Sequence, residues 1–459
     1  MLPLGSVPLF STADRRMKIR LTATNEQEKY EGENSKILTN AVLKITYDGS
    51  HFHGWSAAND NLPPPDDDSE EDVKKGPNGA AFLPPLNINQ RSGGRRRKRG
   101  KRIPGITNIR SVEGVMKKCL AKIYGNVDPA RVQVDGCSRT DKGVHAKSMI
   151  AQMYCLNDEA VLLTEEGKSS LSSIPGKRLP HPTSSTDKSL FMPLPFESNL
   201  GKMMYVLNRM LPPDVRVSAV SETPAKIDSN ESGCSASVPF HPSLDTVGKT
   251  YLYTFSIGDM HDPMRWRHVW HVDGFGRDFD LDLSRKAANA LVGEHDFVAF
   301  RGAFRGSERG RVQDTVCTLS DLRITEERTS NLIDAVDIPL TEFSVGGEYG
   351  GSTINPLTTY TVSMTGDRFL YKMGRFLVGT IVAVGHGKIS VDDVKYALDH
   401  GIWESEKEGG KGKKQHICAP AHGLVLNDVQ YDDEINFHWT GSNRWSTQSR
   451  QEKHSWESA

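Results

Sequence analysis

Residues 131–155 read RVQVDGCSRTDKGVHAKSMIAQMYC and combine a strand, a loop and a second strand. Polar and apolar side chains alternate over residues 131–134, and the apolar run at 149–155 is typical of a buried strand. In the loop between them, Asp141 lies close to Arg139 and Gly143, a context that favours an ionised carboxylate held in a tight turn. Such a turn often has no chemical role, but loops at strand ends frequently carry catalytic groups. Asp141 is therefore the candidate reaction centre.

On both sides of this stretch, the sequence alternates strands and helices. Periodicity predicts further strands at residues 41–47, 250–255 and 360–364. It predicts amphipathic helices at residues 112–123, 200–211, 284–292 and 369–384. The order recurs in both halves of the chain with few long crossovers of the parallel type. This pattern indicates an α+β fold built from two similar sheet-and-helix units.

Other segments lack periodicity and are expected to lie outside these units. Residues 1–40 form an irregular N-terminal extension with several basic residues, for which an organellar targeting segment is one interpretation. Residues 57–104 are predicted to be a disordered, charged insertion, residues 156–195 a linker or second insertion, and residues 433–459 a polar C-terminal tail. The cellular compartment stays open between two alternatives. One is an organelle, either a plastid or a mitochondrion, and the other is the nucleus or cytoplasm.

The charged insertion carries an acidic block at residues 66–72 and a basic run at residues 95–102. Three interpretations of the basic run stay open, namely an RNA-binding segment, a nuclear import signal and a solvated stretch without partner. The net charge of the 459-residue chain is only −1, so any contact with RNA has to come from local patches.

Composition argues against several classes of protein. No run of eighteen apolar residues is present, so we expect no membrane span. The six cysteines, at 119, 137, 155, 234, 317 and 418, form no pair at zinc spacing, and His51 and His53 form a lone H-x-H. The chain also lacks a phosphate-binding loop and a dinucleotide-binding glycine motif. We therefore expect no metal and no cofactor.

Several separated segments, taken in chain order, resemble the TruA-type tRNA pseudouridine synthases. They are residues 45–49 and 52–55, 138–146, 240–242 and 249–253, 293–297 and 300–301, 369–375, and 421–424. The resemblance covers roughly residues 40–56, 105–155 and 196–432. It implies two ferredoxin-like or RRM-like units, at 41–155 and 196–432. Their antiparallel sheets would join into one extended sheet with helices on one face and a central active-site cleft.

The resemblance also implies a function and a site. The protein would be an isomerase that converts uridine to pseudouridine in structured RNA, expected to be the anticodon stem-loop of tRNA, and it would act as a homodimer. Asp141 would be the catalytic residue, and the substrate would be bound by Arg139, Tyr251, Arg375 and Leu424. Lys142, His145 and the basic run are further candidates for contact with RNA phosphates.

Other hypotheses stay open at this stage. Ser56, Gly374 and Phe376 depart from the family pattern, and together with the insertions they motivate a non-catalytic RNA-binding protein or RNA chaperone on the same scaffold. A carboxylate-dependent nucleoside hydrolase, which would release free uracil, is a third hypothesis. Cys137 and His145 could also form a thiol and base pair.

Overall fold

The computed structural model describes residues 37–56, 110–158, 160, 182, 188–229, 235–258, 261–273, 279–303, 314–327, 357–403 and 418–441. The predictions for the N-terminal extension, the charged insertion, most of the linker at 156–195 and the tail beyond residue 441 lie outside these residues. Within the described part, no helix is both long and apolar enough to cross a membrane.

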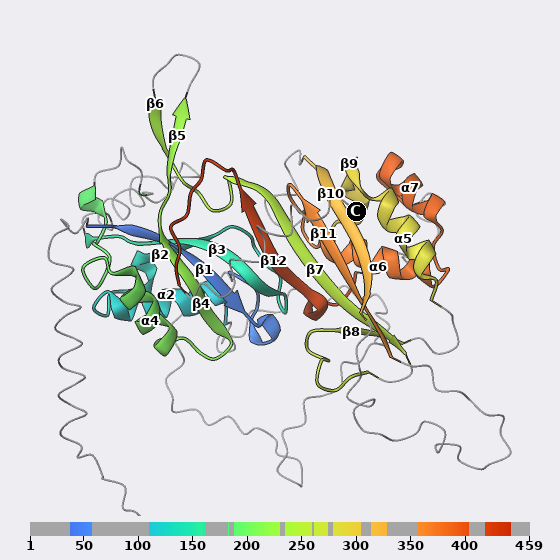
Figure 1. Ribbon diagram of the computed structural model, residues 1–459, viewed down its shortest axis with the longest axis horizontal. Helices are drawn as coiled ribbons and strands as arrows, with labels where there is room; N and C mark the ends of the chain where they lie inside the picture. The colour runs from blue at the N-terminus through green and yellow to red at the C-terminus, as the bar shows by residue number, and fades with distance from the viewer. Residues whose placement is uncertain are drawn as a thin grey trace, which may run out of the picture.

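Eleven strands form one mixed sheet that runs through the whole molecule (Figure 1). Nine follow one another in the order β13-β4-β1-β3-β12-β7-β11-β10-β9, while β2 pairs with β3 and β8 pairs with β7. The strands are β1 Asn40–Tyr47, β2 Val132–Gly136, β3 His145–Cys155, β4 Val215–Glu222, β7 Thr246–Gly258, β8 Trp270–Asp273, β9 Gly293–Asp296, β10 Val316–Glu327, β11 Thr358–Gly366, β12 Leu424–Tyr431 and β13 Thr440–Gly441. A separate hairpin pairs β5 Ala225–Ser229 with β6 Ser235–Pro239.

The sheet has two halves that meet at β12, the last long strand among the described residues. β12 pairs antiparallel with β7 over most of its length, and it pairs in parallel with β3 through only two residue pairs. In chain order, the first half includes β1, α2, β2, β3, α4 and β4, and the second includes β7, α5, β10, β11, α6 and β12, together with β8, β9 and α7. The neighbours are β4-β1-β3-β2 in the first half and β12-β7-β11-β10 in the second. The same order of elements and neighbours therefore occurs twice.

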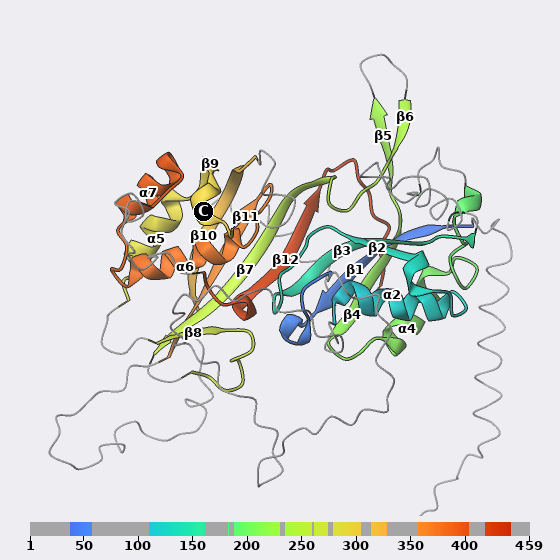
Figure 2. The ribbon, with the colours of Figure 1, turned by 180° about the vertical axis from the view of Figure 1, so that it is seen from behind.

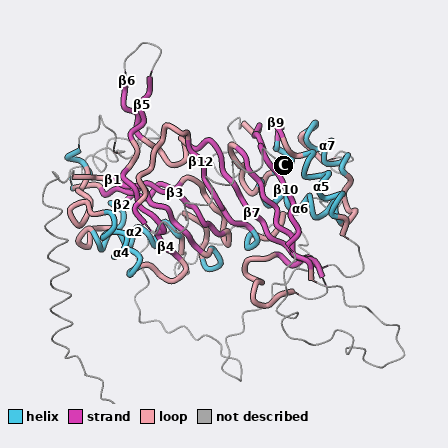
Figure 3. Tube along the Cα trace, viewed as in Figure 1, coloured by secondary structure: helices cyan, strands magenta, loops and turns pink. Residues whose placement is uncertain are grey.

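The α-helices gather at the two ends of the sheet, with α2 and α4 at one end and α5, α6 and α7 at the other (Figures 2 and 3). They are α2 Val112–Ile123, α4 Leu200–Met210, α5 Leu281–Ala290, α6 Met373–Gly385 and α7 Val391–His400. Polar side chains cap most of their N-termini: Ser111 Oγ accepts from the Gly114 amide, and Ser390 and Asp393 form a reciprocal capping box.

The structure confirms most of the predicted elements and corrects one of them. The helices predicted at 112–123, 200–211 and 284–292 match α2, α4 and α5 with small shifts at their ends, and the predicted strands match β1, β2, β3, β7 and β11. The helix predicted from residue 369 is wrong at its start, because α6 begins at Met373. Lys372 has φ +62°, a left-handed conformation that an α-helix cannot include. Residues 369–372 therefore form a turn ahead of the helix.

One main hydrophobic core packs the helices against the sheet and extends across both halves. β3 contributes a nearly continuous buried run, because a central strand is covered on both faces. α6 is buried along almost its whole length, in agreement with its apolar composition. The five cysteines among the described residues are all free thiols.

Candidate active site

The loop that carries Asp141, residues 137–144, joins β2 to β3 and is fixed by hydrogen bonds along its length. The Cys137 amide donates to Ile150 O at 2.8 Å, and the Val144 amide donates to Asp141 O at 3.1 Å. Tyr47 Oη and Thr140 Oγ1 share a buried hydrogen bond of 2.7 Å. These contacts hold the backbone of the loop in one conformation, so the direction of the Asp141 side chain is set by the fold.

The segment that follows β1 forms a close-fitting support for this loop. The Gly143 amide donates to Phe52 O at 3.2 Å, and the Trp55 amide donates to Thr140 O at 3.1 Å. Gly54 has φ +103°, and a Cβ built there would lie 2.4 Å from Thr140 O. Only glycine fits such a close backbone approach in this conformation. The glycine of the Phe-His-Gly-Trp motif is thus required by the shape of the loop that it supports.

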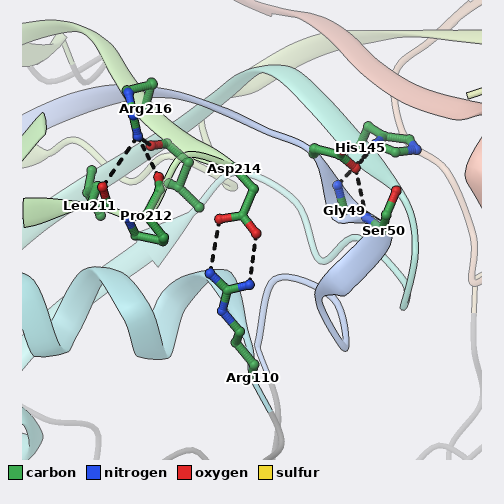
Figure 4. Close-up of polar contacts among 10 residues, drawn as sticks. Gly49, Ser50, Arg110, His145, Leu211, Pro212, Asp214 and Arg216 are labelled. Atoms are coloured by element: carbon green, nitrogen blue, oxygen red, sulfur yellow. Dashed lines mark hydrogen bonds and ion pairs between the residues drawn. The ribbon is translucent and has the colours of Figure 1, made fainter. Parts of the chain in front are cut away.

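A bidentate ion pair braces the same segment from its other side (Figure 4). Arg110 Nη1 and Nη2 donate to the two carboxylate oxygens of Asp214 at 2.8 and 3.0 Å. The guanidinium carbon of Arg110 also lies 4.3 Å from the ring centroid of Phe52. The Asp48 amide donates to Asp214 O at 3.0 Å. The residue before β4, the turn after β1 and the segment before α2 are therefore locked together beneath the loop that carries Asp141.

Asp141 meets Arg375, which comes from the first turn of α6. Arg375 Nη1 lies 3.4 Å from Asp141 Oδ2, and the two side chains are 14% and 22% exposed, respectively. Arg375 is held independently of this pair, because its Nε donates to Ala419 O at 2.6 Å and its own carbonyl accepts from the Ala419 amide at 3.1 Å. The guanidinium is therefore a fixed cationic partner for the Asp141 carboxylate.

Tyr251, on β7, forms another wall of the site. Its hydroxyl and Ser138 Oγ share a hydrogen bond of 3.0 Å, and its ring meets Phe369 edge-to-face with centroids 4.9 Å apart. Burial raises the pKa of the Tyr251 phenol, and the nearby Asp141 carboxylate acts in the same direction, while the bond to Ser138 opposes it. The phenol is therefore neutral at physiological pH and can donate a hydrogen bond.

These residues surround one pocket with a volume of about 280 Å³. Its lining consists of Ser138, Arg139, Thr140, Asp141, Val144, Tyr251, Phe369, Leu370, Tyr371, Lys372, Met373, Gly374, Arg375 and Leu424. All five residues predicted as catalytic or substrate-binding are in this set. Arg139 is exposed at the pocket, whereas Leu424, the first residue of β12, is only 8% exposed. The structure brings the five together, and their roles stay predictions.

Sequence reasoning did not assign a role to the turn before α6, which supplies much of the pocket. Phe369 contacts Tyr251, and the Met373 amide donates to Leu370 O at 2.9 Å to close the turn. Gly302 donates its amide to Tyr371 O at 2.8 Å. The apolar pattern of this segment continues that of the helix, so no local signal in the sequence separates the two.

Gly374, one of the departures from the family pattern, is explained by its neighbours. It is buried in the pocket wall, and a Cβ built on it would lie 3.1 Å from Met364 Sδ and 3.9 Å from Leu424 Cδ1. That distance to sulfur is tight, so a larger residue here would require the Met364 side chain to move. In this protein, Met364 fills the space that a side chain at position 374 would use.

The hypothesis of a Cys137–His145 thiol and base pair does not fit the geometry. Cys137 is fully buried, burial raises its pKa to about 11, and its Sγ contacts Met149 Sδ at 3.6 Å. His145 Nδ1 accepts from the Gly49 amide at 3.0 Å, and His145 Nε2 donates to His422 O at 3.0 Å. With 4% exposure, His145 is also too buried to reach an RNA phosphate. It is a positioning residue of the turn after β1 (Figure 4).

Among the described residues, one group has the composition of a metal site, namely Asp48, His145 and His268. Asp48 Oδ1 lies 3.1 Å from His145 Nδ1, and Asp48 Oδ2 lies 3.7 Å from His268 Nε2. However, both ring nitrogens of His145 already bond to backbone groups, so a metal would have to displace the Gly49 amide. We therefore assign no metal to this cluster.

Comparison of the sequence with known proteins identifies relatives of this chain. Residues 287–432 match the family model described as tRNA pseudouridine synthase. The chain is 22% identical over 393 residues to tRNA pseudouridine synthase A 2 of Clostridium tetani, covering 86% of this chain and 99% of the relative. It is 27% identical over 330 residues to tRNA pseudouridine synthase A of Citrifermentans bemidjiense and 26% identical over 327 residues to that of a Geobacter species, covering 72% and 71% of this chain and 91% of each relative.

These comparisons define the class of protein, an RNA-modifying isomerase. The chain belongs to the TruA family of tRNA pseudouridine synthases.

Proposed function

We propose that this protein converts uridine to pseudouridine in the anticodon stem-loop of tRNA and that Asp141 carries out the reaction. Membership of the TruA family provides the type of reaction and the class of substrate. The observation that supports Asp141 most directly is its position in the pocket, where it pairs with Arg375 and shares the wall with Tyr251. The stem-loop as the target rests on the family resemblance alone.

The reaction needs little beyond a well-placed carboxylate. The bond between uracil N1 and ribose C1′ breaks, the base turns, and C5 forms a new bond to C1′. C5 loses a proton and N1 gains one, so the overall composition of the nucleotide is unchanged. An anionic Asp141 serves at the sugar either as a nucleophile toward C1′ or as a base and electrostatic partner of an oxocarbenium-like state.

The remaining residues fit the steps around this chemistry. Arg375 provides a fixed cationic partner for Asp141 and sets its direction, since its guanidinium is itself anchored to Ala419. Tyr251 provides a ring against which uracil can stack, and Leu424 closes the apolar wall. Arg139, exposed at the pocket, is suited to hold a phosphate or the base displaced when the uridine flips out of its stem.

A substitution at Asp141 tests the assignment. The variants Asp141→Asn and Asp141→Ala are expected to lower the rate of pseudouridine formation by a factor on the order of 10³ or more, with tRNA binding retained. Release of tritium from C5 of labelled uridine measures the reaction, because C5 loses its hydrogen in every turnover. Nucleoside mass spectrometry separates pseudouridine from free uracil, the product of the hydrolase hypothesis, and from no product, the outcome for an RNA chaperone.

We further propose that the two halves of the sheet are ferredoxin-like units that enclose the active site in a central cleft. The recurring order of elements and the neighbours β4-β1-β3-β2 and β12-β7-β11-β10 support this assignment. Because β4 pairs with β1, we place the boundary between the units after β4 instead of at residue 196. The expected homodimer remains a prediction, which sedimentation of the purified protein with and without tRNA would test.

A further inference from the structure

The segment between β7 and β8, residues 261–269, lies beside the turn that supports the catalytic loop. His268 Nε2 is 3.7 Å from Asp48 Oδ2, and the rings of His268 and His145 have centroids 4.6 Å apart. His145 itself is four positions after Asp141 in the chain. In both Figure 1 and Figure 2 this segment lies at the same edge of the sheet as the turn after β1. It therefore borders the active-site region without lining the pocket.

Residues 264–268, Met-Arg-Trp-Arg-His, present an unusual surface for a loop. Met264 is 76% exposed and Trp266 is 49% exposed, although both are large apolar residues. The guanidinium carbon of Arg267 lies 5.3 Å from the ring centroid of Trp266, and Arg267 is exposed as well. An indole and a guanidinium thus face solvent side by side. Tryptophan is enriched at interfaces, where its ring offers a large apolar face, so this exposed indole is a candidate contact site.

The backbone of this segment is ordered by its own hydrogen bonds. The Arg265 amide donates to Asp262 O at 3.2 Å, and the amides of His268 and Val269 donate to Arg265 O at 2.8 and 3.0 Å. The Asp262 side chain accepts from the Met264 amide at 2.8 Å. Trp266 is therefore carried on a compact turn, so binding a partner through its ring requires little further ordering of the backbone.

We propose that residues 264–268 form a second contact site for the tRNA substrate, in which the Trp266 ring stacks on an unpaired base and Arg267 binds a phosphate. Aromatic stacking joined to a cationic group is the common means by which proteins hold unpaired nucleotides. Arg265 pairs with Glu327 and His268 lies beside Asp48, so the exposed Arg267 is the group whose charge complements the RNA backbone. The inference rests on the proposed function, since it takes tRNA as the substrate.

The first test separates stacking from simple exposure. Trp266→Ala is expected to raise the Kd for unmodified tRNA about tenfold, because stacking on one base contributes on the order of this factor. Trp266→Phe keeps an aromatic face and is expected to recover most of the affinity. Tyr205→Ala is the matched control, because Tyr205 is 65% exposed on α4 in the first half of the sheet. It is expected to leave both Kd and rate unchanged.

The second test separates a phosphate contact from a structural role. The slope of log Kd against log salt concentration is expected to fall by roughly 0.7 in Arg267→Ala and to stay as in wild type in Trp266→Ala. The control is Arg285→Ala, since Arg285 has a side chain 49% exposed on α5. Arg285→Ala is expected to keep the wild-type slope.

The outcomes separate this inference from the proposed function. If purified wild-type protein makes pseudouridine and Trp266→Ala binds tRNA as tightly as wild type, the second contact site is wrong, and a protein partner for this surface would give the same result. A Trp266→Ala variant with unchanged Kd and a slower single-turnover reaction at saturating tRNA would also overturn it. If wild type binds tRNA through Trp266 but yields no pseudouridine, the proposed function fails while the contact site stands.

Discussion

Arg375 Nη1 lies 3.4 Å from Asp141 Oδ2, although the two residues are 234 positions apart in the chain. Each is held by its own half of the molecule: Asp141 by the supports of the β2–β3 loop, and Arg375 by Ala419. The distance is at the long end for a hydrogen bond. The length of this contact therefore depends on how well the two halves of the molecule are aligned.

Arg375→Ala is expected to lower kcat by about 10²-fold, because Asp141 would lose both its counter-charge and its fixed direction. Arg375→Lys keeps the charge but not the bond from Nε to Ala419 O, so we expect it to restore only part of the rate. Single-turnover pseudouridine formation at saturating tRNA measures the effect. The control is Arg323→Ala, because Arg323 has a side chain 74% exposed on β10. Equal rates for Arg375→Lys and wild type would contradict the directional role.

The bond between Tyr251 and Ser138 is expected to stabilise the pocket. Tyr251→Phe and Ser138→Ala should each lower the free energy of unfolding, and the double variant should lose less than the sum of the two. The expected coupling energy is about 1 kcal/mol, the usual net contribution of a hydrogen bond. Urea denaturation of the four proteins measures it. Strict additivity would mean that the two hydroxyls do not interact in solution.

Gly54→Ala is expected to destabilise the protein by about 2 kcal/mol or more and to slow catalysis. The new Cβ would adopt an unfavourable φ and would meet Thr140 O at 2.4 Å, so the loop that carries Asp141 would have to shift. Gly125→Ala is the matched control, since Gly125 has φ +88° and an added Cβ would meet nothing within 4 Å. That variant should lose only about 1 kcal/mol, from backbone strain, and keep its activity.

Stability is expected to decrease as the pH falls below about 6.5. Burial lowers the pKa of His145 and of His422, so each imidazole binds a proton more readily in the unfolded chain. The unfolded state then holds more protons just below the ordinary histidine pKa, and the free energy of unfolding rises with pH through this window. Urea midpoints at about pH 7.5 and about pH 5.5 measure it. His145→Gln should show a smaller change between the two, and an unchanged slope would refute the contribution of His145.

Asp48 is expected to affect stability in a different, more acidic pH range. The bonds from Ser50 and the nearby His145 and His268 rings lower the pKa of this carboxyl despite its partial burial, which acts in the opposite direction. Its contribution to stability is therefore present above about pH 4 and is lost only in stronger acid. The two transitions can be separated by measuring unfolding over the whole acid range.

Local patterns in the sequence were enough to predict several helices and strands. The apolar stripe of α2, ended by Gly125, and the alternation in β2 needed no knowledge of the rest of the fold. The predicted start of α6 was wrong because a single left-handed residue, Lys372, interrupts the apolar run, and no Gly or Pro among residues 369–372 marks the interruption. Strand β12 was also missed, since its neighbours are decided by long-range pairing with β3 and β7.

In the candidate site, too, local patterns indicate some residues, while others are brought together only by the fold. The turn residues around Asp141 suggest an acid in a defined loop, but no periodicity connects it to Tyr251 or Arg375. Family resemblance named these positions, and the structure places them in one pocket. Trp266 and its neighbours were not singled out at all, because exposure of a tryptophan cannot be read from a loop sequence.

The position of β12 has a consequence for how the protein is made. Its first residue, Leu424, lies in the pocket wall, and the strand fills the space between β3 and β7 in the middle of the sheet. During translation, every other described strand of the sheet except β13 would leave the ribosome before β12. The nascent chain would thus have the Asp141 loop complete but its pocket open until β12 has been made. A transcript cut short before residue 424 would yield a protein with Asp141 present and no closed pocket in which to use it.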